Sequence, residues 1–240
     1  HESGARPVSY GLLYGESLGA LLCCPAMERV PEPELMEDDL QAEAYARADF
    51  DEPNALFCQS LLDRLELPEP ARVVDLGCGP ADIPVRLARL RPSWVLDAVD
   101  GSRAMLRHAN DRIRKEGLSH RIRIHCSMLP VLALPEAGFD LIISNSLLHH
   151  LPDPSLLWRE VARLARPGAL LALMDLRRPD STEEAMALVE HYSAGEPEVL
   201  RRDFTASLLS AFTPNEVREQ LRQAGLEKTE QRQWAEQAVQ

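Results

Sequence analysis

Short continuous apolar runs alternate along this chain with longer stretches of helical periodicity. The runs lie at Val73–Leu76, Trp94–Asp100, Phe139–Asn145 and Ala169–Asp175, and a further strand is expected at Arg121–Cys126, where polar and apolar residues alternate. Runs of this length, bounded by turn residues, are typical of strands in a parallel sheet whose two faces are both covered. Between them, apolar residues recur every three or four positions, which predicts helices. The pattern predicts an α/β protein with a doubly wound, mostly parallel sheet of about six or seven strands.

Capping and breaking residues place the ends of the predicted helices. Helices are expected over residues 28–52, from Pro53 to Pro68, and over residues 154–166. Ser102 is a suitable N-cap for a helix that ends at Gly117. The stretch Thr213–Glu216 is a typical helix start, leading to Gly225. Residues 27–68 are therefore expected to form an N-terminal helical cap.

The predicted fold is organised around residues 73–82, where a buried strand is followed by a glycine turn and a helix. Gly77 and Gly79 lack a Cβ, so they permit a tight turn and the close approach of a ligand. Asp82 is expected to cap the next helix. Asp100 ends the second strand about twenty residues later, where ribose-binding carboxylates lie in nucleotide-binding folds. A glycine turn can also serve packing alone. The acid at position 100 is the observation that favours nucleotide binding over that alternative.

The residue at position 82 indicates which nucleotide fits. A dinucleotide fingerprint has its third glycine here and binds a pyrophosphate at the helix N-terminus. A carboxylate at this place repels a diphosphate but imposes no such penalty on a sulfonium cation. The sequence therefore favours S-adenosyl-L-methionine over NAD or FAD.

The segment Asp75-Leu76-Gly77-Cys78-Gly79, followed by Asp100, resembles the class I S-adenosylmethionine-dependent methyltransferases. The resemblance extends from about Ala71 to Leu226. It implies a Rossmann-like fold, S-adenosyl-L-methionine as cofactor and methyltransferase activity on a small-molecule acceptor.

The resemblance also implies a set of cofactor-binding residues. Many family members place an Asp after the third strand to hold the adenine amino group, whereas this chain has Cys126-Ser127-Met128. Ser127 can hydrogen-bond and Met128 can pack against adenine. The residues implied are Asp75, Gly77, Cys78, Gly79, Asp82, Asp100, Gly101, Ser102, Ser127, Met128, Asn145 and Ser146.

A histidine pair follows the fourth of these strands, and Asp175 ends the fifth. Ligands bind beyond the carboxyl ends of strands in open parallel sheets, so His149, His150 and Asp175 are candidate catalytic residues. A neutral histidine there can remove a proton from the acceptor. A structural role in the loop is the alternative. No metal is expected, because adjacent side chains diverge and no third ligand is evident.

Residues 176–212 form an expected insertion at the acceptor site. Arg177 and Arg178 in an acidic protein favour an acceptor that carries a carboxylate or phosphate. Arginines that pair with surface carboxylates are the alternative. Tyr45 and Tyr192 are further substrate-binding candidates, and Tyr45 is equally compatible with a packed core position.

Composition narrows the class of protein. The 240 residues carry a formal net charge of -12, which disfavours nucleic acid as a partner. Five cysteines without a C-x-x-C pair favour a reducing, cytoplasmic setting, and no segment is long and apolar enough to span a membrane. Oligomeric state is not predicted.

The two ends of the chain differ from the middle. Residues 1–26 are expected to be an extension or a disordered N-terminus, with Met27 a plausible start. Residues 69–240 are expected to form the cofactor-binding domain. Leu226–Gln240 is polar, so the last strand is expected to be short, replaced or lost.

Two rival functions and one variant remain. A nicotinamide oxidoreductase would need glycine in place of Asp82. A non-catalytic, methyltransferase-like subunit that binds a protein partner would bind the cofactor weakly. A methyltransferase acting on RNA or protein is a variant of the main prediction, and the net charge disfavours RNA.

Overall fold

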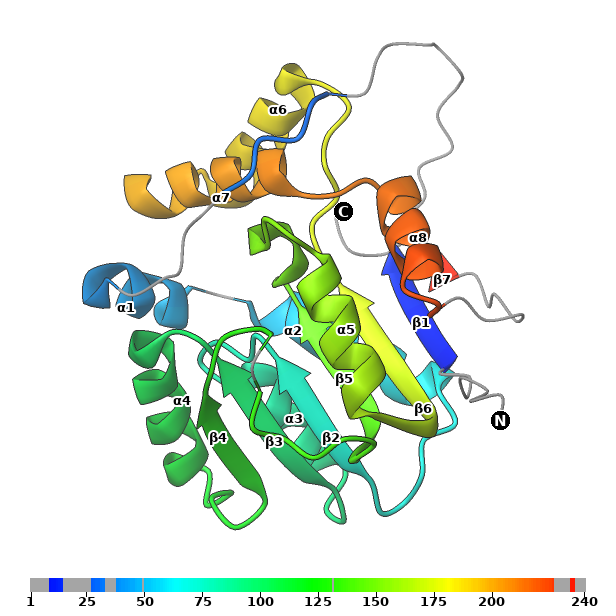
Figure 1. The fold of residues 1–240 in the computed structure, drawn as a ribbon. Helices are drawn as coiled ribbons and strands as arrows, with labels where there is room; N and C mark the ends of the chain where they lie inside the picture. Colours follow the sequence, from blue (N-terminus) through cyan, green and yellow to red (C-terminus); the bar gives the residue numbers. More distant parts are fainter. Residues whose placement is uncertain are drawn as a thin grey trace.

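A computed structural model describes residues 9–14, 27–32, 38–48, 50–130, 132–226 and 234–235. Its centre is a sheet with the strand order β4-β3-β2-β5-β6-β1-β7, in which all neighbouring strands are parallel (Figure 1). This confirms the predicted α/β fold. The strands are β1 (Ser9–Tyr14), β2 (Arg72–Leu76), β3 (Val95–Asp100), β4 (Ile122–Cys126), β5 (Phe139–Asn145), β6 (Ala165–Met174) and β7 (Trp234–Ala235).

Helices connect and cover these strands. Ser102 caps α4 by accepting the N–H of Met105, and Thr213 and Glu216 form a capping box at the start of α8, as predicted. The helices are α1 (Asp39–Arg47), α2 (Asp51–Arg64), α3 (Asp82–Leu90), α4 (Arg103–Lys115), the 3-10 turn η1 (Leu148–His150), α5 (Ser155–Leu164), α6 (Thr182–Ser193), α7 (Glu198–Ser210) and α8 (Pro214–Gln223).

Each face of the sheet carries its own hydrophobic core. Helices α2, α3 and α4 pack on one face, and α5 and α8 pack on the other. Side chains alternate between the two cores along a strand, so that Val73 lies in the first core and Val74 in the second. Burial on both faces explains why the strands are continuous apolar runs in the sequence.

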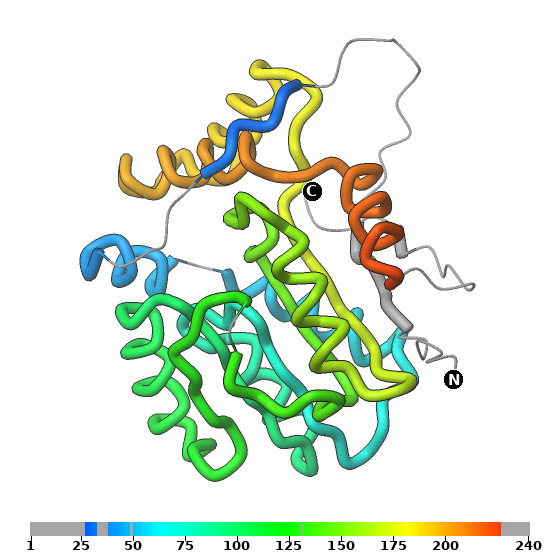
Figure 2. Tube along the Cα trace, viewed as in Figure 1, coloured from blue at the N-terminus to red at the C-terminus, as the bar shows by residue number. Residues whose placement is uncertain are grey.

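A further helical layer lies over the carboxyl ends of the strands. Helices α6 and α7 pack together there, and residues 27–32 run beside α7 (Figures 1 and 2). Helix α1 joins this layer because Gln41 Nε2 donates a buried 2.7 Å hydrogen bond to Asp203 on α7. The carboxyl edge of the sheet is therefore covered by segments that lie between β1 and β2 and between β6 and β7 in the sequence.

The N-terminal part of the chain differs from the prediction in two places. Strand β1 pairs with β6 in a stretch where no strand was predicted, and residues 1–8 and 15–26 lie outside the described residues. The helix predicted over residues 28–52 is divided into α1 and the start of α2, and it is wrong for residues 28–32, which have no helical structure. Prolines at positions 31 and 33 explain why residues 28–32 are not helical, because a proline disfavours the helical conformation of the residue before it.

Two other boundaries also differ. Helix α5 ends at Leu164 rather than at residue 166, and β6 begins at once with Ala165. Strand β6 therefore includes Gly168, whose φ of +81° suits a glycine. Strand β7 has two residues and pairs in parallel with β1. The last strand is thus short, one of the three expected outcomes.

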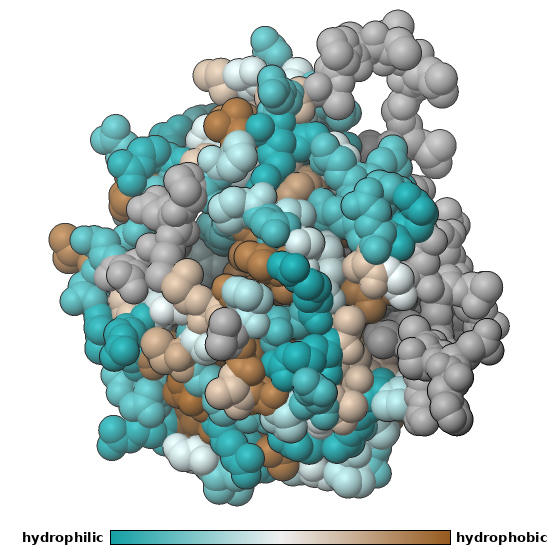
Figure 3. Space-filling view, viewed as in Figure 1, coloured by the Kyte–Doolittle hydropathy of each residue, from teal (hydrophilic) through white to brown (hydrophobic). Residues whose placement is uncertain are grey.

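The face of the molecule that Figure 3 shows has no large exposed apolar area among the described residues. That face is mostly hydrophilic, with small, separate hydrophobic patches. Among the described residues, none of the helices has the length and apolar character that crossing a membrane requires.

Trp158 provides a test of the packing between α5 and α8. Its side chain is fully buried, and its Nε1–H donates a 3.0 Å hydrogen bond to Gln220 Oε1. We expect Trp158→Phe to lower the free energy of unfolding by about 1–2 kcal/mol, because it removes this bond and part of the ring. Denaturant titration measures the change. The control Met186→Ala, at an exposed position, should shift it by less than about 0.5 kcal/mol, and an equal loss in both variants would contradict the account.

Candidate active site

The glycine turn lies between β2 and α3, at the carboxyl edge of the sheet. Gly77 has a φ of +80°, and a Cβ there would lie 2.9 Å from Leu147 Cβ, so the position excludes other residues. The backbone N–H groups of Gly77 and Cys78 both donate to the carbonyl oxygen of Val99 at 2.9 Å. Gly79 also has a positive φ, of +50°, but a Cβ there would meet no atom within 4 Å. The turn is therefore tightly fixed at Gly77 and open at Gly79.

Asp100 faces this turn from the end of β3. One carboxylate oxygen accepts the N–H of Gly79 at 2.8 Å and the other accepts the N–H of Ser102 at 2.7 Å. Burial raises the pKa of Asp100, while the N–H groups of Ser102, Gly79 and Gly101 oppose that shift by stabilising the carboxylate. The predicted pairing of the glycine turn with this acid is present.

Three buried oxygens beside the turn have no hydrogen-bond partner among the described residues. They are Asp75 Oδ1, Ser144 Oγ and Asn145 Oδ1, from the adjacent strands β2 and β5. Burial raises the pKa of Asp75 to about 8, and the charge of Asp100 adds to the shift. Buried polar atoms are normally paired. Unpaired acceptors at an open turn suit a ligand with an ammonium group.

Two other cofactor-site candidates lie at the end of β4. The N–H of Ser127 donates a 3.0 Å hydrogen bond to the carbonyl oxygen of Asp100, which places Ser127 next to the β3 acid. The side chain of Met128 is 61% exposed. An exposed thioether at this edge is free to contact a flat ring.

Ser146 begins the loop that follows β5. Its φ is +55°, which is uncommon for a residue other than glycine, and its N–H donates to the carbonyl oxygen of Met174. Strained backbone of this kind concentrates at functional sites. The strain redirects the chain from β5 into η1, which carries the histidines.

Asp82 does not cap α3, so that prediction is wrong. The N-cap is Ala81, with a φ of 61° and no side-chain cap bond. The carboxylate of Asp82 instead accepts hydrogen bonds from Arg86 Nε at 2.6 Å, from Asn54 Nδ2 at 3.0 Å and from Arg112. Two arginines thus compensate its charge. Asp82 therefore repels a diphosphate less than an unpaired carboxylate would.

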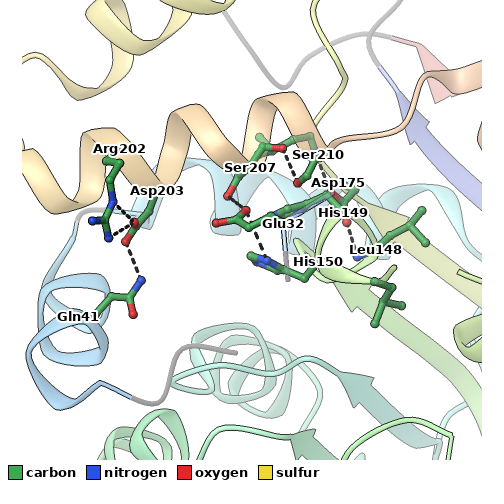
Figure 4. Close-up of polar contacts among 12 residues, drawn as sticks. Glu32, Gln41, Leu148, His149, His150, Asp175, Arg202, Asp203, Ser207 and Ser210 are labelled. Atoms are coloured by element: carbon green, nitrogen blue, oxygen red, sulfur yellow. Dashed lines mark hydrogen bonds and ion pairs between the residues drawn. The ribbon is translucent and has the colours of Figure 1, made fainter. Parts of the chain in front are cut away.

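His149 and Asp175 form a buried pair at the ends of β5 and β6 (Figure 4). Asp175 Oδ1 lies 2.5 Å from His149 Nδ1, and both side chains are 3% exposed. Asp175 also accepts the N–H groups of Leu148 at 2.7 Å and Leu176 at 2.8 Å. With Nδ1–H donating to a fixed carboxylate, Nε2 of His149 is left as a proton acceptor. This pair has the arrangement of an oriented general base.

His150 and Glu32 lie beside that pair. The two histidine rings are 4.0 Å apart between centroids, and His150 Nδ1 is 3.7 Å from Glu32 Oε2. Burial lowers the pKa of His150 to about 4, and the neighbouring His149 contributes to the shift. Both reasons given above against a metal are therefore wrong: the adjacent rings do not diverge, and Glu32 offers a third ligand.

Comparison with known proteins agrees with this geometry. Residues 73–168 match the family model described as a methyltransferase domain. Over these residues the chain is similar to the class I S-adenosylmethionine-dependent methyltransferases. The cofactor of this family is S-adenosylmethionine. The unpaired acceptors Asp75 Oδ1 and Asn145 Oδ1 and the open turn at Gly79 fit its ammonium-bearing end.

Among the curated relatives of this methyltransferase domain are two small-molecule methyltransferases. Trans-aconitate 2-methyltransferase of Variovorax paradoxus is 36% identical over 126 residues, which are 52% of this chain and 45% of that protein. The 27-O-demethylrifamycin SV methyltransferase of Amycolatopsis mediterranei is 28% identical over 180 residues, covering 75% and 62%. The matched regions thus span about half to three fifths of these relatives.

A solved structure shares the fold of the methyltransferase domain. The crystal structure of a SAM-dependent methyltransferase from Aquifex aeolicus has a TM-score of 0.60 and 21% sequence identity, and the match covers 78% of this chain and 88% of that one. At this identity the likeness supports the fold.

Tyr45 on α1 lies close to both halves of the site. Its side chain packs against Phe50 with ring centroids 4.8 Å apart. Burial raises the pKa of Tyr45 to about 12, and the charges of Asp100 and Asp175 add to the shift. The phenol of Tyr45 therefore stays neutral at physiological pH and keeps its proton to donate.

The other substrate candidates do not converge on the histidines. Arg177 pairs with Glu184 at 2.9 Å, and the buried Arg178 pairs with Glu216 at 2.7 Å. Tyr192 is 40% exposed and contacts His191 edge to face. The two arginines therefore have carboxylate partners within the protein, the alternative raised above.

Residues 27–32 contribute to the site although no pattern in the sequence indicated it. Arg29 Nε donates to the carbonyl oxygen of Ser210 at 2.6 Å, and its Nη2 donates to the carbonyl oxygens of His149 and Leu151 at 3.0 and 3.1 Å. Its guanidinium also lies 3.9 Å from the centre of the Phe212 ring. This arginine fixes the segment that carries Glu32. Pro31 and Pro33 are the feature of the sequence that could have indicated a non-helical segment here.

We expect Asp75 to make cofactor affinity depend on pH. In the empty protein it keeps its proton below about pH 8, whereas a bound cation favours the carboxylate, so binding releases a proton. We expect the affinity for S-adenosylmethionine, titrated calorimetrically without acceptor, to rise between pH 6 and pH 8 by up to about tenfold per unit. The rise should flatten above pH 8. The matched variant Asp75→Asn should lose the slope, and an identical slope in both proteins would refute the assignment.

Proposed function

We propose that this protein transfers the methyl group of S-adenosylmethionine to a hydroxyl oxygen of a small-molecule acceptor, with His149 as general base. The observation that carries the proposal is the buried His149–Asp175 pair, 2.5 Å apart, at the same sheet edge as the glycine turn and Asp100. The relatives named above supply the support for methyl transfer to small molecules.

The chain's own residues act on the acceptor and its proton. The bound cofactor supplies a methyl carbon already activated by a positively charged sulfur. Asp75, Asp100 and Asn145 would hold this cofactor, and methyl transfer from it to the acceptor oxygen would release S-adenosylhomocysteine. Nε2 of His149 takes the hydroxyl proton, while Asp175 holds the ring in the correct tautomer and stabilises the imidazolium. Burial of the pair excludes water from the reacting groups.

The charges around the histidines favour a hydroxyl over a carboxylate as acceptor. Carboxylates are already ionised at neutral pH and need no base, whereas a hydroxyl does. Glu32 and Asp175 also place buried carboxylates beside the reaction site. Arg29 and Arg178, the nearby cations, are bonded to backbone carbonyls and to Glu216. This arrangement disfavours a strongly anionic acceptor.

The enclosure of the pair favours a small acceptor over a macromolecule. His149 and Asp175 are 3% exposed, and α7 with residues 27–32 lies over them (Figures 1 and 4). A nucleotide within an RNA or a side chain within a folded protein reaches such a site only with large rearrangement. The net charge of -12 opposes RNA as well.

Matched acceptor pairs test the proposal. The protein is incubated with S-adenosylmethionine and a panel of small alcohols and phenols, each paired with the carboxylic acid of the same size. Mass spectrometry detects S-adenosylhomocysteine and locates the methyl group. We expect methyl ethers from the hydroxyl members. Methylation confined to the acids, or to added RNA, would overturn the proposed acceptor class while leaving the cofactor assignment intact.

A further inference from the structure

Glu32, His149 and His150 bring three metal-ligating side chains together from two distant parts of the sequence. One ring nitrogen of each histidine and one carboxylate oxygen of Glu32 lie within 4.8 Å of one another. In Figure 4 the carboxylate of Glu32 lies between Ser207 on α7 and the ring of His150. Two imidazoles with one carboxylate are a ligand set that Zn²⁺ takes in proteins, with the remaining position open.

Two of these ligands are held in place by other groups. Asp175 binds Nδ1 of His149, which fixes the ring and leaves Nε2 for a ligand. Metal-ligating histidines commonly donate their other N–H to a carboxylate in this way. Ser207 Oγ donates a 3.1 Å hydrogen bond to Glu32 Oε2, and Arg29 anchors the backbone of the same segment through three carbonyl oxygens. The positions of Glu32 and His149 are thus fixed in advance.

His150 completes the set with an unsatisfied atom. Its Nδ1 is buried and has no hydrogen-bond partner among the described residues. The 3.7 Å between this nitrogen and Glu32 Oε2 is too long for a hydrogen bond. Two ligands of one tetrahedral ion, each about 2.0–2.1 Å from it, lie roughly 3.4 Å apart. A small movement of either side chain therefore brings both to an ion.

We propose that Glu32, His149 and His150 form a binding site for a divalent transition-metal ion of the Zn²⁺ type. The site binds the ion through one carboxylate and two neutral imidazoles. Its open coordination position faces the acceptor side of the sheet edge, where an oxygen of a small molecule or a water completes the coordination.

The metal ion and the proton of the acceptor compete for the same nitrogen atom of His149. Bound Zn²⁺ occupies Nε2 of His149, which the proposed function assigns to proton removal, and so it inhibits methyl transfer until a chelator removes it. This consequence rests on the proposed function. The binding itself does not, and the experiment therefore measures binding without cofactor or acceptor.

Calorimetric titration of the chelator-treated, intact chain with ZnCl₂ tests the site, and Co²⁺ absorption reports the coordination. We expect one equivalent to bind, at least about tenfold more weakly in Glu32→Gln and in His150→Gln. Ser207→Ala, which leaves all three ligands in place, should weaken it less. His120→Gln, at an exposed position far from η1 in the sequence, is the control and should bind as the wild type does.

Two results would overturn the proposal. One is the absence of stoichiometric Zn²⁺ binding by the folded wild-type chain. The other is equal affinity in the wild type, Glu32→Gln and His150→Gln, which would assign binding to other surface groups. Thermal unfolding with and without Zn²⁺ shows that each variant is folded, and only proteins that keep the site should gain stability from the ion.

Discussion

Replacing His149 by glutamine lowers kcat about a hundredfold to ten-thousandfold, the usual contribution of a positioned general base. Glutamine keeps a side chain of similar reach but cannot accept the acceptor's proton at neutral pH. The affinity for S-adenosylhomocysteine should stay within about threefold, because the residues that we expect to bind the cofactor lie around Gly79 and Asp100 and not at η1. Steady-state kinetics with a hydroxyl acceptor that the wild type methylates measures the loss of kcat. Calorimetry measures the affinity for S-adenosylhomocysteine separately.

Asp175→Asn is the companion to this variant. It removes the carboxylate that accepts Nδ1–H of His149, so it should also lower kcat while leaving cofactor affinity in place. His120→Gln again serves as the control for a surface histidine. A loss of less than about threefold in His149→Gln would contradict the assignment of the base, as would an equal loss of cofactor binding.

Replacing Asp100 by alanine weakens binding of S-adenosylhomocysteine at least about a hundredfold, since hydrogen bonds to a charged group each contribute about 1.5–3 kcal/mol. The carboxylate has two tasks. It accepts the N–H groups of Gly79 and Ser102, which orders the glycine turn, and it offers acceptors for ribose hydroxyls. Alanine removes both.

Controls separate the loss of binding from the loss of folding. Asp111→Ala removes an exposed carboxylate on α4 and should leave cofactor affinity unchanged. Thermal unfolding without ligand shows whether Asp100→Ala retains the fold. A folded Asp100→Ala protein that binds S-adenosylhomocysteine as tightly as the wild type would show that the cofactor lies elsewhere.

Features that depend on local sequence could be predicted well. The strand–glycine–helix segment, the cap at Ser102 and the capping box at Thr213 each arise from residues a few positions apart. Burial on both faces of the sheet makes the strands continuous apolar runs, which identifies them without structural information. Asp175 and His149 could be placed at one edge because the carboxyl ends of parallel strands meet there.

Features that depend on distant partners could not be predicted. Asp82 was expected to cap a helix, but Arg112 and Arg86 bind it instead, and Arg112 comes from another helix. The approach of Glu32 to His150 joins residues more than a hundred positions apart, through the anchor that Arg29 provides. No periodicity in the sequence encodes such contacts.

Strand β1 was missed for a different reason. Residues 9–14 were included in the expected N-terminal extension, and the glycine among their apolar residues interrupts a strand pattern. Their place beside β6 is set by pairing with a strand that lies more than 150 residues further along the chain. Only the assembled sheet gives this segment its partner.

Side-by-side calorimetric titration of the wild-type chain with S-adenosylmethionine and NADH tests the central claim most directly. Both rival functions predict different results: an oxidoreductase binds NADH, and a non-catalytic subunit binds neither ligand well. The structure predicts one equivalent of S-adenosylmethionine bound per chain and no heat of binding for NADH. Binding of NADH, or no binding of S-adenosylmethionine by the folded protein, would contradict the account.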